Sequence, residues 1–131
     1  KTQIGAEVLY NPEDKKARTD ADVRLMTKDS IYTLGISNIG NGSNVDLTYG
    51  KRVLDQVYLR GGLFDGKLGV GADVGFGKPV SLSGALFDIR HGSYRIRSDI
   101  QLWKDTYAVG QWTWYGRDHH RVNYFGLRKT F

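Results

Sequence analysis

The chain has 131 residues, 40% of them hydrophobic and 17 of them glycine, a length and composition that suit one folded domain and argue against disorder. It has no cysteine, which excludes disulfides, thiolate metal sites and a cysteine nucleophile. Its net charge of +5 does not indicate a nucleic-acid partner, because the basic residues alternate with acids or lie in expected turns, without an interleaved aromatic platform.

The first half of the chain predicts four β-strands joined by tight turns. Apolar and polar residues alternate along each of them, and this period of two is the period of a strand. Turns are indicated by Asn11-Pro12, by Lys28-Asp29 and by Asn41, which lies between two glycines and tolerates positive φ. The four expected strands span residues 2–10, 17–26, 31–39 and 43–53.

The second half continues with six strands of the same period. The clearest follows the hairpin turn Asp65-Gly66 and ends before Pro79, which cannot donate to a strand ladder. In the fourth strand from the end the apolar residues change parity near Gly84, which indicates a bulge there and leaves the facing of this strand undecided. The six expected strands span residues 57–63, 68–76, 80–90, 94–103, 107–115 and 121–131.

These elements predict an all-β fold, a single closed up-and-down antiparallel barrel of about ten strands over residues 1–131. No apolar run approaches the ~20 residues of a membrane helix, and closure of the sheet removes its unpaired edges. The alternation leaves two orientations open. The apolar side chains point inward in a soluble, lipocalin-like barrel that binds a small apolar ligand, or outward into lipid around a polar lumen.

The composition of the polar face favours the outward orientation. It carries five acids and five arginines near strand centres, and such a balanced set suits a closed interior in which each charge needs a partner. An exposed face is usually rich in lysine, but most lysines here lie in the expected turns. The predicted lumen charge network consists of Glu7, Asp22, Arg24, Asp46, Arg60, Asp73, Arg95, Arg97, Asp99 and Arg128.

Aromatic residues on the apolar face point the same way, because they lie near strand ends, where the interfacial girdles of membrane barrels are found. The expected lipid-facing girdle consists of Tyr10, Tyr49, Phe76, Tyr94, Trp112 and Trp114. A barrel of this size has little interior space, so ten charged side chains should fill it. The sequence therefore predicts a transmembrane β-barrel with a polar, plugged lumen.

No catalytic residue, metal site or cofactor is expected. His119 and His120 are adjacent, so on a strand they would face opposite sides, and no further ligand is identifiable. Ser81, Ser83 or Ser98 with a histidine would be needed for a nucleophile and base, which keeps an outer-membrane lipid-modifying enzyme as an alternative. The leading hypothesis is non-enzymatic.

Four short motifs carry a resemblance to a known family. They are Tyr-Leu-Arg-Gly-Gly-Leu at 58–63, Gly-Val-Gly-Ala-Asp at 69–73, Leu-Phe-Asp-Ile-Arg at 86–90 and Tyr-Phe-Gly-Leu-Arg at 124–128. Together they resemble the C-terminal barrel of MCE-family, MlaD-like phospholipid-transport proteins. The resemblance covers about the last 75 residues, and the remaining part shares only the pattern of alternation.

The resemblance implies a barrel in the bacterial outer membrane that is the anchor or terminal element of a trans-envelope phospholipid-transport bridge. Its partners would be outer-membrane lipids, upstream MCE and inner-membrane transport components, and the barrel-assembly machinery, which would read Phe125, Leu127 and Phe131. Because the chain begins at Lys1 without a leader, we expect a domain of a longer chain that forms homo-oligomers through its missing upstream part.

Overall fold

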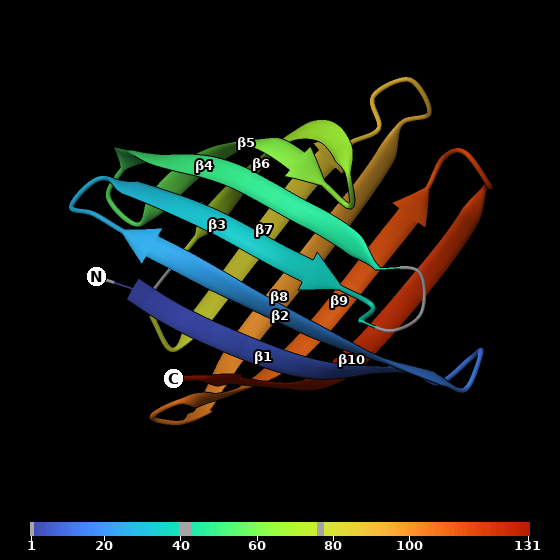
Figure 1. Cartoon of the computed structure of the whole chain (residues 1–131), viewed down its shortest axis with the longest axis horizontal. Helices are drawn as coiled ribbons and strands as arrows, with labels where there is room; N and C mark the ends of the chain where they lie inside the picture. Colours follow the sequence, from blue (N-terminus) through green and yellow to red (C-terminus); the bar gives the residue numbers. More distant parts are fainter. Residues whose placement is uncertain (1, 40–42, 76–77) are drawn as a thin grey trace.

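The computed structural model describes residues 2–39, 43–75 and 78–131 and shows a closed barrel of ten strands, drawn in Figure 1. The strands are β1 (Thr2–Asn11), β2 (Lys16–Met26), β3 (Ser30–Ser37), β4 (Asn44–Leu54), β5 (Val57–Phe64), β6 (Lys67–Val74), β7 (Val80–Phe87), β8 (Ser93–Trp103), β9 (Thr106–Tyr115) and β10 (His120–Thr130). Each strand pairs antiparallel with its neighbours in the sequence, and β1 pairs with β10. This confirms the all-β, closed antiparallel architecture that the alternation predicts.

Closure is made by six Cα pairs between β1 and β10, from Gly5 opposite Thr130 to Tyr10 opposite Phe125. The two chain ends lie at the same end of the barrel, which follows from an even number of antiparallel strands (Figure 1). We call this end the terminal rim and the opposite end the far rim. No helix in the described residues is long and apolar enough to cross a membrane, a criterion that does not apply to strands.

The apolar side chains of the strands point away from the barrel. Among the described residues, 31 large hydrophobic side chains are exposed, and only seven hydrophobic residues are buried. Leu34, Val70 and Leu127, from three different parts of the wall, are exposed by 52, 56 and 55%. The outer face is thus apolar on every strand, and the polar positions of the alternating pattern face the interior.

Strand β7 differs from the prediction. Its pairing with β8 runs without a register shift from Val80 to Phe87, so the predicted bulge near Gly84 is wrong. The parity of the sequence changes because Ala85 and Phe87 point into the interior, where they are buried against Phe64. When one strand has apolar residues on both faces, the alternation in its sequence is interrupted in the same way as by a bulge. The register shifts that the structure does show lie in β4–β5 and in β8–β9.

Five of the six predicted girdle residues can be placed. Tyr10, Tyr49, Tyr94 and Trp112 are each exposed on the outer face by 40 to 45%, and Trp114 is half-buried beside the ring of His119. The sixth, Phe76, lies outside the described residues. The placed girdle residues therefore lie toward the far rim on β1, β8 and β9, with Tyr49 of β4 nearer the terminal rim.

Candidate functional site

The barrel interior contains a network of arginine and carboxylate side chains. Arg97 from β8 reaches across to β1, where its Nη1 lies 2.8 Å from Glu7 Oε2, and its Nε lies 2.8 Å from Asp99 Oδ1. Arg128 from β10 shares Glu7 at 3.1 Å and binds Asp22 with both terminal nitrogens, at 2.7 and 2.9 Å. These contacts link β1 and β2, at the start of the chain, to β8 and β10, near its end.

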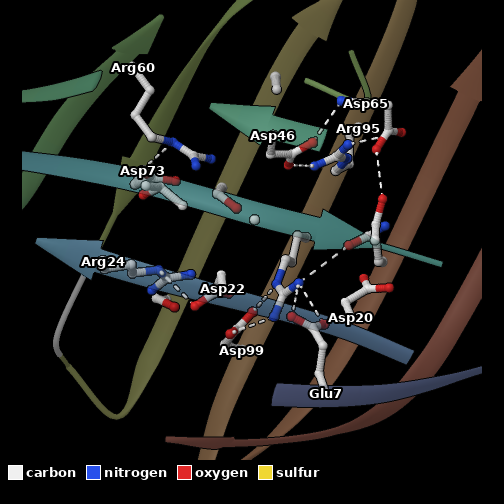
Figure 2. A pocket seen from close by; sticks show the side chains of 18 of the residues that line it. Glu7, Asp20, Asp22, Arg24, Asp46, Arg60, Asp65, Asp73, Arg95 and Asp99 are labelled. Atoms are coloured by element: carbon white, nitrogen blue, oxygen red, sulfur yellow. Dashed lines mark hydrogen bonds and ion pairs between the residues drawn. The ribbon is translucent and has the colours of Figure 1, made fainter. Parts of the chain in front are cut away.

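Separate pairs extend this network toward both rims, as Figure 2 shows. Arg60 Nε lies 2.8 Å from Asp73 Oδ2 in the terminal half. In the far half, Arg95 lies 3.4 Å from Asp46 and 3.1 Å from Asp65. These forked contacts use the planar guanidinium groups of arginine, which can serve two carboxylates at once.

All ten charges of the predicted network lie inside the barrel and take part in an ion pair. For Arg24 the pair is the longest, with Nε 3.9 Å from Asp22 Oδ1. The structure adds charges that the prediction did not include. Arg18 and Asp20 form a pair at 2.9 Å on β2, and they could have been found because they share the parity of Asp22.

Asp65 is the charged residue that alternation could not assign to the interior. It lies in the hairpin turn between β5 and β6, and its carboxylate turns inward to Arg95 and accepts a hydrogen bond from the Tyr115 hydroxyl at 3.4 Å. Its own backbone N–H donates to Asp46 at 2.7 Å. A turn residue has no fixed facing, so only the fold shows this contact.

Inward-facing glycines give the arginines their space. A Cβ added at Gly5 would overlap the guanidinium of Arg128, and one at Gly50 would lie 2.9 Å from Cγ of Arg60. The arginine side chains can therefore lie close against the backbone of the neighbouring strand inside a narrow barrel. These glycines of the polar face leave the space that the charge network occupies.

An aromatic cluster lies inside the barrel at the far rim. Phe64 and Phe87, the last residues of β5 and β7, are 0 and 2% exposed, and their ring centroids lie 6.5 Å apart. Tyr115, the last residue of β9, packs edge-on against Phe87 at 6.2 Å. The guanidinium of Arg95 lies 5.4 Å from the centre of the Phe87 ring. An aromatic cluster thus packs inside the barrel between the far rim and the charge network.

The space left inside is a cavity of about 110 Å³ lined by the charged residues, together with Ser81, Ser83 and Gln111. Ligand sites for small molecules usually measure about 300 to 1,000 Å³, so this cavity is too small for such a ligand. Elsewhere in the barrel, the side-chain oxygens of Thr48 and Thr113 are buried without a hydrogen-bond partner among the described residues. Buried polar atoms of this kind usually bind ordered water.

The lining contains no catalytic constellation within the part of the chain that is described. Ser81 and Ser83 reach the cavity, but no histidine lines it, and no group of three or more acids and histidines could hold a metal ion. The one described histidine with a carboxylate partner is outside the barrel wall. His91 Nδ1 lies 3.0 Å from Asp88 Oδ1 in the turn after β7, and this hydrogen bond lowers the pKa of Asp88.

Comparison with known proteins gives one match. A family model described as a lipocalin-like domain matches residues 41–131. The search of curated proteins and the search of solved structures each give no match.

The family match overturns the resemblance to MCE-family, MlaD-like proteins. All four motifs that carried it fall within residues 41–131, and nothing indicates an MCE family. The motifs combine apolar residues with glycine, arginine or aspartate, which the outer wall and the interior of a narrow barrel require in any case. They indicate a barrel fold and do not identify a family. The predicted role as a bridge for MCE-type phospholipid transport is therefore wrong.

Proposed function

The chain belongs to the lipocalin-like domain family and forms a closed barrel, and we propose that this barrel is embedded in a lipid bilayer as a closed, non-enzymatic element. The observation that carries the proposal is the orientation of the wall. The hydrophobic face points outward on all ten strands, and the charges point into the lumen. A soluble barrel that binds an apolar ligand needs the opposite arrangement.

The extent of the outer apolar face supports this proposal. Soluble monomers rarely expose a continuous apolar patch above about 600 Å², whereas here the exposed apolar side chains surround the whole barrel. Covering a large apolar side chain fully with lipid is favourable by about 1.5 to 3 kcal/mol relative to leaving it exposed to water. Only a surrounding apolar phase, or a partner that covers the full circumference, would match this face.

The dimensions of the wall fit a bilayer. The strands contain eight to 11 residues, close to the roughly 9 to 11 residues of a tilted membrane strand. Exposed aromatic rings lie toward both rims, with Tyr10 and Trp112 nearer one and Tyr32 and Tyr49 nearer the other. Aromatic side chains in these positions are suited to the two headgroup regions.

The interior supports a closed rather than a conducting barrel. Arg97 of β8 reaches Glu7 of β1, Arg128 of β10 reaches Asp22 of β2, and the Phe64 and Phe87 rings pack inside the barrel at the far rim. The remaining cavity of about 110 Å³ is smaller than a ligand site. We therefore expect no stable conductance in a planar bilayer and no passage of phospholipid along the axis. A steady open channel would contradict the closed interior.

A second candidate is a soluble barrel that binds a small molecule, because the family is described as lipocalin-like. Its ligand would have to be small and polar, since charged groups line the cavity. An apolar ligand, as first predicted for this alternative, does not fit such a lining. A lipid-modifying enzyme has no comparable support, because no nucleophile and base meet among the described residues of the cavity.

A bacterial outer-membrane location stays a prediction, as do assembly by the barrel-assembly machinery and homo-oligomers. The proposed assembly signal ends the chain, where Phe125 and Leu127 face outward on β10 and Phe131 is 72% exposed. Lys129, where an apolar residue would be expected in such a signal, faces Ala6 of β1 and lies 3.7 Å from Asp105.

The test of the proposal is extraction from membranes. The full chain, expressed with a secretion leader, should stay in the membrane fraction after washing with carbonate and urea. It should require detergent for purification and run faster on an unheated gel than on a heated one. A protein that is monodisperse in water without detergent would contradict bilayer embedding and favour the second candidate.

A further inference from the structure

The outer wall has a groove across β2, β3, β4 and β5. Its volume is about 560 Å³, within the range of about 300 to 1,000 Å³ for ligand sites. Its walls come from successive register rows, in which Val23 pairs with Leu34 and Leu34 with Leu47. The lining consists of Val23, Leu25, Tyr32, Thr33, Leu34, Leu47, Thr48, Tyr49, Gly61 and Gly62.

The groove exists because Gly61 faces outward on β5 between two larger residues. Tyr49 of β4 and Val70 of β6 are its partners in register. A Cβ placed at Gly61 would meet only a backbone oxygen at 3.9 Å, so the space outside it is open. At the outward-facing Gly110, by contrast, the rings of Phe125 and Trp112 already lie within 4.0 Å of the same point.

One end of this groove is polar and the other is apolar. Toward the terminal rim the Tyr32 and Tyr49 rings stand 5.0 Å apart, and the Tyr49 hydroxyl lies 3.2 Å from Ser30 Oγ. Lys51 follows two residues after Tyr49 on the same face and pairs in register with Ser30. It is exposed, and it forms no ion pair with the described residues. The groove thus has tyrosine hydroxyls at this end, and Lys51 is the next outward-facing residue beyond them on β4.

We propose that the groove binds one acyl chain of an anionic glycerophospholipid, whose phosphate lies against Lys51 and the Tyr49 hydroxyl. The inference rests on the proposed function, because only a barrel in a bilayer presents this face to lipid. The apolar floor matches a hydrocarbon chain, and the tyrosine pair marks the depth at which a lipid changes from chain to headgroup. Lys51 supplies the charge complementarity that selects an anionic lipid over a zwitterionic one.

The nearby Arg52 does not replace Lys51 in this role. Its Nη2 lies 2.7 Å from Asp29 Oδ1, so its charge is already balanced. The lysine therefore provides the unbalanced charge beside the groove. The acyl-chain end and the headgroup end of the proposed lipid site can be tested separately.

The test measures lipid retained by the full-length barrel in native mass spectrometry, after purification in detergent with equal amounts of phosphatidylglycerol and phosphatidylcholine. Gly61→Leu fills the groove. Its matched control is Gly84→Leu on β7, outside the groove lining, because a Cβ at Gly84 likewise meets only a backbone oxygen at 3.9 Å. We expect one retained phosphatidylglycerol on the wild type and on Gly84→Leu, and its loss from Gly61→Leu.

The headgroup is tested with Lys51→Gln, an exposed substitution that leaves the groove intact, and with Lys104→Gln in the β8–β9 turn as its control. Lys51→Gln should reduce the preference for phosphatidylglycerol by about fivefold, the effect of one lysine near an anionic surface, and Lys104→Gln should not. Equal lipid retention by Gly61→Leu and the wild type would overturn the inference. A dimer that Gly61→Leu abolishes would also overturn it, in favour of a second copy as occupant.

The two proposals fail in different ways. If the barrel needs no detergent, both fall together. If it needs detergent and shows the fast band on an unheated gel, yet retains no lipid at this groove, the bilayer proposal stands and only the lipid site is contradicted.

Discussion

The outer and inner faces of the barrel wall are made by the same ten strands, but the outer side chains are exposed and apolar, whereas the inner charged side chains are buried and paired. On the outer face, side chains such as Val70 are more than half exposed and make few demands on particular neighbours. On the inner face, Arg128 is 2% exposed and is held by two carboxylates. The comparison teaches that polarity matters outside and pairing matters inside.

The largest effect is expected from Arg128→Met. The substitution leaves the Asp22 and Glu7 carboxylates inside the barrel without one of their partners, which should lower the free energy of unfolding by about 3 to 5 kcal/mol. Urea unfolding of the barrel in lipid vesicles measures this change. The matched control is Arg52→Met, which removes an ion pair of the same 2.7 Å length from an exposed position. It should cost about 0 to 1 kcal/mol, and equal costs would remove the distinction.

The next effect belongs to the outer face. Val70→Arg places a charge in the middle of the apolar wall and should destabilise the barrel in vesicles by about 2 to 4 kcal/mol. The control is Val70→Leu, which keeps the position apolar and should change stability little. An arginine at this position that is tolerated as well as leucine would show that the outer face meets water.

A smaller effect separates two serines of the same strand. Ser93 faces the interior, is 1% exposed and accepts a hydrogen bond from the Gly116 N–H at 3.0 Å. Ser93→Ala leaves that buried donor unsatisfied and should cost about 1 to 3 kcal/mol. Ser98 shares the outward parity of Ile96 and Ile100, so Ser98→Ala should stay within about 0.5 kcal/mol. The difference between the two variants in one unfolding assay is the result to check, and its absence would contradict their opposite facing.

The smallest effect concerns the Asp88–His91 contact outside the wall. The hydrogen bond from His91 holds the pKa of Asp88 below its usual range. A lowered pKa means that the contact stabilises the fold above the ordinary aspartate value of about 3.9, and that this contribution is lost as the pH falls through the lowered pKa. The stability difference between wild type and Asp88→Asn should therefore be present at neutral pH and vanish in that acid range. A difference that grows with acidification would have the wrong sign.

Alternation along the chain was enough to predict the strands and the facing of the charges in the predicted network. It worked because a closed barrel turns a period of two into an inside and an outside. Asp65, Phe64 and Phe87 could not be predicted in the same way. The first lies in a turn, and the two rings are apolar residues at interior positions, so their roles depend on strand pairing across the lumen.

The family could not be read from the sequence for a related physical reason. The motifs at residues 58–63 and 124–128 combine outward apolar residues with an inward arginine and glycine, and many narrow barrels need this combination. The groove at Gly61 was also beyond reach, because it depends on the register that sets Tyr49 and Val70 on either side of one glycine.

The central claim, that the outer face meets lipid, is tested most directly with single cysteines carrying spin labels, since the chain has none of its own. Leu82→Cys and Leu86→Cys place the label on the outer face of β7, and Ser81→Cys and Ser83→Cys place it in the lumen. In vesicles, we predict that the two outer labels collide with dissolved oxygen and are shielded from a water-soluble nickel complex, while the two inner labels show little contact with oxygen. Outer labels that are quenched by the nickel complex as fully as a label in a loop would contradict the claim.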